Sequence, residues 1–140
     1  MSGFLLDTNV VSELIKPQPD SRVVRWIDDT DEALLFLSVL TLGEIRKGVE
    51  GLRLGRRRSR LESWLQRDLP SRFHDRILGI DAVIADRWGA ISATAAAKGH
   101  TVPVIDGLLA ATAVHHNLVL VTRDVAGVAG TGAVTLNPWL

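Results

Sequence analysis

The sequence predicts an α/β fold, a three-layer α/β/α domain with a mainly parallel sheet of four or five strands. Short apolar runs alternate along the chain with longer segments whose apolar residues recur at helical spacing. This alternation is typical of parallel sheets covered on both faces, because each parallel strand needs a crossover connection. With 140 residues, 46% of them apolar, the chain has the size of a single domain spanning residues 1–140.

The first quarter of the chain predicts one strand and two helices. Residues 4–6 form a short apolar run typical of a buried strand. A helix is expected over 10–16, because the proline at position 17 cannot continue it. Asp20 favours the start of a second helix, since its side chain can accept hydrogen bonds from the first free N–H groups.

A strand and two helices are expected next. Residues 34–37 form the second apolar run. Thr41 is expected to cap the third helix, with Glu44 at the position that completes a capping box. A fourth helix over 61–69 is expected to end at Pro70.

The second half of the chain predicts three strands and two helices. The helix that contains Trp88 should end near Gly99, and an alanine-rich helix is expected over 107–116. Asp106 opens that second helix. The expected strands are 77–80, 118–121 and 134–136.

Composition excludes several classes of protein. The chain has no cysteine, which excludes disulfides, thiolate zinc sites and cysteine nucleophiles. Basic and acidic residues number 16 each, so net charge gives no hint of a nucleic-acid partner. Neither a signal-peptide pattern nor an apolar run of about 20 residues is present, so we expect a cytoplasmic protein without membrane association.

Aspartates follow several of the predicted strands. Asp7, Asp81 and Asp124 each come after an apolar run, and Asp106 follows a shorter one. The carboxyl ends of parallel strands meet at one edge of the sheet, where ligands bind. Carboxylates gathered there would repel one another, and a divalent cation with a preference for oxygen ligands, Mg²⁺ or Mn²⁺, would relieve that repulsion.

Each of these acids taken singly also has a purely structural explanation. Asp7, Asp81 and Asp106 are favoured helix-capping residues, and Asp124 suits a turn. Glu44 could serve only its capping box. Composition and periodicity alone therefore predict an α/β domain that has an acidic cluster at the sheet edge, with its role open.

Four motifs occur in order along nearly the whole chain. They are residues 5–10 (LLDTNV), 42–48 (LGEIRKG), 106–113 (DGLLAATA) and 121–124 (VTRD). Together they resemble the PIN-domain family, in particular its VapC toxins and their FitB-like members. The ending Asn137-Pro138-Trp139 is also common in such toxins. One departure is the loop at 125–128, where many members carry an aromatic residue shortly after the fourth acid.

The resemblance implies roles for particular residues. Asn9 and Thr122 would orient the metal ligands or water. Asp81 has no counterpart among the family's acids, so we assign it to capping the helix that contains Trp88. The implied metal-binding and catalytic set is Asp7, Glu44, Asp106 and Asp124.

The same resemblance implies a function. The chain would be a Mg²⁺- or Mn²⁺-dependent endoribonuclease, hydrolysing RNA with metal-activated water and acting as the toxin of a type II toxin–antitoxin pair. It would form a homodimer, and a small DNA-binding antitoxin of the ribbon-helix-helix type would inhibit it.

Two alternatives remain from the sequence. A receiver-like phosphoaspartyl signalling domain also gathers acids around Mg²⁺, but it needs a lysine at a late strand end, where this chain has Arg123 between Thr122 and Asp124. A non-catalytic PIN scaffold that binds RNA or protein is the second alternative, and the presence of all four acids argues against it.

A basic stretch is the strongest charge cluster in the sequence. It would form either a solvated junction between two helices or a surface that contacts RNA phosphate or the antitoxin. The residues of this stretch are Arg46, Arg53, Arg56, Arg57 and Arg58.

Overall fold

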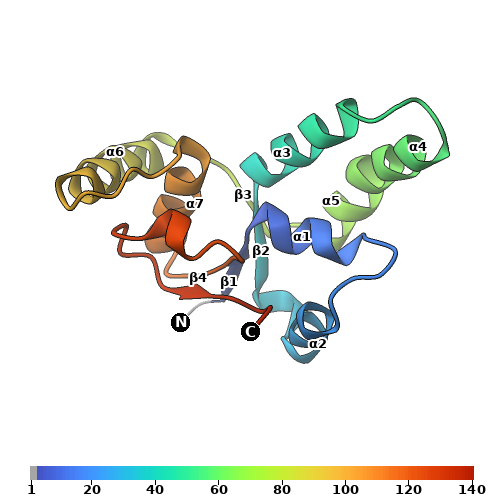
Figure 1. Ribbon diagram of the computed structural model, residues 1–140, viewed down its shortest axis with the longest axis horizontal. Helices are drawn as coiled ribbons and strands as arrows, with labels where there is room; N and C mark the ends of the chain where they lie inside the picture. The colour runs from blue at the N-terminus through green and yellow to red at the C-terminus, as the bar shows by residue number, and fades with distance from the viewer. Residues whose placement is uncertain (1–2) are drawn as a thin grey trace.

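The computed structural model describes residues 3–140 and contains a five-stranded sheet in which all neighbouring strands are parallel (Figure 1). The strand order is β3-β2-β1-β4-β5, so β1 lies in the middle, between β2 and β4. The predicted α/β class and strand number are confirmed. The strands are β1 (Phe4–Leu6), β2 (Leu35–Ser38), β3 (Ile77–Leu78), β4 (Val119–Val121) and β5 (Thr135–Leu136).

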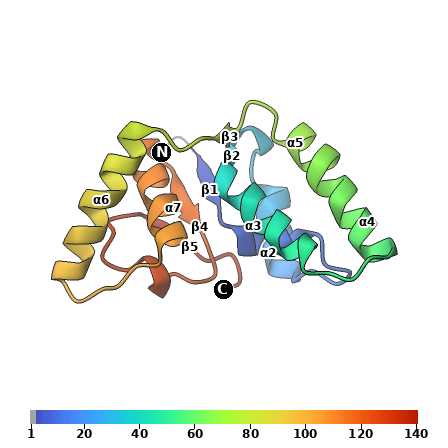
Figure 2. The same ribbon diagram turned by 90° about the horizontal axis from the view of Figure 1, so that it is seen from above.

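Helices cover both faces of this sheet. Figure 2 shows α6 and α7 on one side of the strands and the earlier helices on the other. None of the helices in residues 3–140 combines the length and apolar character needed to cross a membrane. The helices are α1 (Thr8–Leu14), α2 (Ser21–Asp29), α3 (Val39–Glu50), α4 (Arg56–Ser63), α5 (Leu69–Arg72), α6 (Ala82–Ala97) and α7 (Val104–His115).

The central strands divide the core into two halves. Successive side chains of a strand point to opposite faces, so Leu5 and its partner Leu120 pack beneath α7. Leu6 and its partner Val121 pack on the other face against α1 and α2. All four side chains are at most 1% exposed, which fixes the register of β1 against β4.

The start of α3 differs from the expected one. Ser38 is the cap, and its Oγ accepts a hydrogen bond from the Leu40 N–H at 3.0 Å. Strand β2 runs directly into the helix without a loop, so the last strand residue is the first that can cap. The predicted capping role of Thr41 is therefore wrong, and Glu44 lies in the second turn rather than in a capping box.

Pro70 does not end the fourth helix. A π-helical turn, Trp64–Asp68, joins α4 to α5, and the Leu69 N–H donates to the Trp64 carbonyl five residues earlier. A proline inside a regular helix leaves one carbonyl without a donor and clashes with it. The wider turn changes the bonding pattern just before Pro70, so the chain stays helical to Arg72.

Asp81 caps α6, as we assigned from the sequence. Its Oδ1 accepts a hydrogen bond from the Ile84 N–H at 2.9 Å. We expect Asp81→Ala to lower the free energy of unfolding by about 1 kcal/mol, because a free N–H is left at the helix start, whereas Asp81→Asn should cost little. Urea denaturation of the two variants measures this difference. Equal losses in both would contradict a capping role.

Candidate functional site

The four candidate acids come from four separate segments. Asp7 directly follows β1, and Asp124 comes three residues after β4, so these two lie at the same edge of the sheet. Glu44 is in α3 and Asp106 is in the first turn of α7, on the opposite face. Among the described residues, the element before α7 is helix α6 and not a strand, so the expected position of Asp106 directly after a strand is wrong; its place in α7 positions it.

Asp7 is the most firmly held of the four acids. Its Oδ1 accepts a hydrogen bond from the Thr8 N–H at 2.7 Å and thereby caps α1. Its Oδ2 accepts from the Thr122 hydroxyl at 2.8 Å and from the Asn9 amide at 3.4 Å. The two polar residues singled out from the sequence therefore both contact the first acid.

Two threonines that the sequence analysis did not assign to the site orient Glu44. The Thr8 hydroxyl donates to Glu44 Oε1 at 2.6 Å and lies 3.3 Å from the Thr41 hydroxyl. Thr41 is fully buried one helical turn before Glu44. Its spacing of three residues from Glu44 puts both on one side of α3, and that spacing is the signal that could have identified Thr41.

A glycine allows Asp106 and Asp124 to approach each other. The Gly127 N–H donates to Asp124 Oδ1 at 3.0 Å, and the Asp124 N–H donates to the Thr122 hydroxyl at 3.1 Å. A Cβ on Gly127 would lie 2.6 Å from Asp124 Oδ2 and 3.2 Å from Asp106 Oδ2. The sequence analysis treated Gly127 only as a loop residue, and its closeness to both acids depends on the tertiary fold.

Charge repulsion couples the four acids electrostatically. Burial raises the pKa of Asp7, and the charges of Glu44 and Asp124 raise it further, against the hydrogen bonds from Thr122 and Thr8. Burial also raises the pKa of Asp106, and the charges of the three other acids add to this effect. The four carboxylates therefore form one electrostatically coupled cluster, which we call the acidic pocket.

The carboxylates of the acidic pocket are not arranged as a complete set of metal ligands. Within residues 3–140, no three acidic or histidine side chains stand close enough together to hold a metal ion as they are. Glu44 accepts from the Thr8 hydroxyl and Asp124 from the Gly127 N–H. These two carboxylates are thus held by hydrogen bonds from within the chain.

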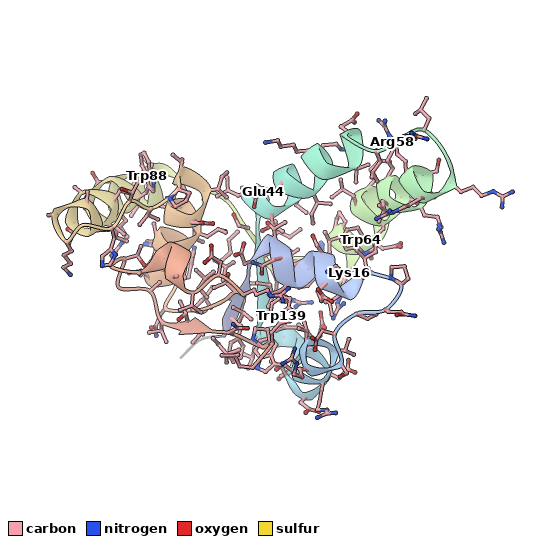
Figure 3. All side chains as sticks on the ribbon, in the orientation of Figure 1. Lys16, Glu44, Arg58, Trp64, Trp88 and Trp139 are labelled. Carbon is pink, nitrogen blue, oxygen red and sulfur yellow. The ribbon has the colours of Figure 1, made fainter. Side chains whose placement is uncertain are left out.

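The basic stretch runs from Arg46 in α3, the helix of Glu44, to the start of α4. Figure 3 shows Arg58 near the outer end of α4, far from Glu44. Arg58 pairs with Glu50 and with Glu62, each at 2.7 Å, and also donates to the Leu52 carbonyl. This residue therefore joins α3 to α4, as expected of a junction between helices. Arg46 pairs with Glu50 at 3.5 Å. Within residues 3–140, no ion pair is formed by Arg53, Arg56 or Arg57.

Comparison with known proteins identifies relatives of nearly the same length. Toxin FitB of Neisseria gonorrhoeae (strain ATCC 700825 / FA 1090) is 37% identical over 136 residues, which cover 97% of this chain and 98% of the relative. The VapC ribonuclease Y4jK of Sinorhizobium fredii (strain NBRC 101917 / NGR234) is 35% identical over 97% of both chains.

Solved structures agree with these sequence matches. The crystal structure of FitAcB from Neisseria gonorrhoeae has a chain that superposes with a TM-score of 0.92 at 37% identity, covering 97% of this chain and 98% of that one. A structure of FitAB bound to an IR36 DNA fragment gives a TM-score of 0.93 at 35% identity, covering 98% and 96%. The family model for the PIN domain matches residues 4–126. The chain therefore belongs to the PIN-domain family and, within it, to the toxins of the VapC and FitB type.

Proposed function

We propose that this chain is a cytoplasmic, metal-dependent endoribonuclease of one domain, residues 1–140, and the toxin of a type II toxin–antitoxin pair. The observation that carries the proposal is the acidic pocket, in which four carboxylates from four segments repel one another. Its relatives include a protein named as a toxin and another named as a VapC ribonuclease.

The residues of the acidic pocket suit Mg²⁺ or Mn²⁺. Both cations prefer carboxylate oxygens, and Mg²⁺ also keeps several waters. Burial raises the pKa values of Asp7 and Asp106, and repulsion from the neighbouring acids raises them further; a divalent cation would offset both effects. Gly127 supports this fit, because it leaves free the space beside Asp106 and Asp124 that a Cβ would take. When bound, the cation would neutralise charge on a phosphodiester and activate water for its hydrolysis.

Hydrogen bonds from the chain's own residues orient some acids of this site more firmly than others. Asp7 accepts three hydrogen bonds, so its two oxygens keep a constant orientation. Thr122 contributes most to this, since its hydroxyl donates to Asp7 and also accepts from the Asp124 N–H. Within residues 3–140, the Asp106 carboxylate accepts no hydrogen bond, so its oxygens are available to a cation or a substrate water.

The proposed function includes a partner that restrains it. Solved relatives include assemblies named FitAB and VapBC that are bound to DNA. By analogy, we propose a small DNA-binding antitoxin for this chain and a homodimer of the toxin itself. An arginine of the antitoxin could pair with the carboxylates of the acidic pocket and compete with the metal there.

Metal binding should depend on the acids of the acidic pocket. Calorimetric titration with Mn²⁺ should detect binding that Asp7→Asn and Asp106→Asn each weaken by more than about tenfold, because each removes a charged oxygen donor. Asp81→Asn is the matched control and should bind Mn²⁺ like the unaltered chain. Unchanged binding in the Asp7→Asn, Asp106→Asn double variant would contradict the assignment.

Without metal, the acidic pocket should destabilise the fold at neutral pH. The pKa of Asp106 is raised above 3.8 in the folded state, so the folded chain binds more protons than the unfolded one. The free energy of unfolding therefore falls as pH rises from about 3.8 through the raised pKa. In EDTA at pH 7, Asp106→Asn should raise the melting temperature by up to a few degrees. This gain should shrink as the pH is lowered through that interval; a constant gain at every pH would refute the electrostatic cause.

Expression of the chain alone should arrest bacterial growth, and Asp7→Ala should relieve the arrest. Purified chain with Mn²⁺ should cleave cellular RNA, whereas Asp7→Ala should lose at least about a hundredfold in rate, because the best-oriented acid is gone. Asp81→Asn should keep full activity. A harmless chain that left a broad panel of RNAs intact would favour the non-catalytic scaffold that only binds RNA or protein.

A further inference from the structure

Arg123 lies next to the acidic pocket, and both its backbone N–H and its carbonyl form hydrogen bonds. Its N–H donates to Asn9 Oδ1 at 3.4 Å, and Asn9 in turn contacts Asp7. Its carbonyl accepts a hydrogen bond from the Asn137 amide at 3.3 Å. The residues on either side of it, Thr122 and Asp124, both belong to the candidate site. The position of Arg123 is therefore tied to that of the acids.

The side chain of Arg123 rests on a fixed aromatic ring. Its guanidinium carbon lies 5.1 Å from the centre of the Trp139 ring, within the range of a cation–π contact. Trp139 is only 5% exposed and packs into the larger core cluster. The Trp139 N–H also donates to Asn137 Oδ1 at 2.9 Å. The turn formed by residues 137–139, labelled by Trp139 in Figure 3, thus holds both the backbone and the side chain of Arg123.

The charge of Arg123 is paired with no acid in the part of the chain that the structure describes. The residue is exposed, and within residues 3–140 its guanidinium forms no ion pair. This differs from Arg58 and Arg72, whose guanidinium groups pair with glutamates. A guanidinium whose face lies on an indole keeps its N–H edges available for another ligand. The guanidinium of Arg123 is thus held in a fixed position, and its N–H donors remain available to bind a ligand.

A polyanion approaching the acidic pocket needs a positive group near it. Four carboxylates repel the RNA backbone, and the chain has a formal net charge of zero that supplies no general attraction. The edge of a guanidinium matches two oxygens of one phosphate. We propose that Arg123 binds a phosphate of the RNA backbone next to the bond that is cleaved, and that Trp139 and Asn137 position it for this contact.

This inference rests on the proposed function for the identity of the ligand. The first test measures RNA binding directly, using a fluorescent single-stranded RNA of mixed sequence and the inert Asp7→Asn chain. Arg123→Gln in this background should weaken binding about tenfold and reduce the slope of log affinity against log salt by about 0.7, the value for one phosphate contact. Arg87→Gln, which removes an exposed arginine on α6, is the matched control and should change neither quantity.

The second test separates substrate binding from chemistry. In the active chain, Arg123→Gln should raise KM for RNA several-fold and leave kcat nearly unchanged. Asn137→Ala should raise KM in the same direction but less. If Asn137 acts through Arg123, the double variant should have the KM of Arg123→Gln alone. A KM increase from Asn137→Ala that adds fully to that of Arg123→Gln would refute the positioning role, as would a loss of stability without any change in KM.

The outcomes distinguish this inference from the proposed function. If the chain cleaves RNA and Arg123→Gln behaves like Arg87→Gln, the inference is wrong while the ribonuclease function stands. If the chain cleaves no RNA but binds it through Arg123, the function fails and the phosphate contact is supported. If Arg123→Gln weakens only the binding of a co-expressed partner protein, the guanidinium belongs to a protein interface and the RNA assignment is overturned.

Discussion

Repulsion among four neighbouring carboxylates is the constraint on which the rest of this structure depends. The acidic pocket holds four like charges, and burial together with the charges of the neighbouring acids raises the pKa of two of them, Asp7 and Asp106. Two well-packed half-cores flank the central strands and hold the segments in place against this repulsion. Glu44 and Asp106 enter from helices on opposite faces, so neither face alone can form the site.

Several aspartates follow strands, but only some of them belong to the candidate site. The order of the strands in the sheet explains the difference. Asp7 and Asp124 follow β1 and β4, which are neighbouring inner strands of the sheet. Asp81 follows the region of β3, which lies at the outer edge, and its carboxylate turns to the start of α6 instead. The same residue type in a similar local setting therefore joins the acidic pocket in one place and only caps a helix in another.

Local patterns were sufficient to predict much of the fold. Apolar runs located the strands to within one or two residues, and helical spacing located the covering helices. Asp7 and Asp124 could be expected at the sheet edge from these patterns, but Glu44 depended on the resemblance to PIN domains. Thr8 and Gly127 were not assigned to the site, because their contacts join segments that only the folded chain brings together.

Two errors have a local cause that the sequence does not reveal. Ser38 and Thr41 are both favoured capping residues, and the direct junction between β2 and α3 decides between them. Pro70 is a reliable helix terminator except where the preceding turn widens, as the π-helical turn does here.

The hydrogen bond between Thr122 and Asp7 has a consequence for the order of events during synthesis. The two residues are 115 positions apart, so a ribosome must add all the residues between them before β4 can pair with β1. A nascent chain that contains only Asp7 and Glu44 has half of the pocket and no Thr122 to orient its first acid. The catalytic potential of the molecule should therefore appear late and abruptly, which gives a cell time to supply a restraining partner before a harmful nuclease exists.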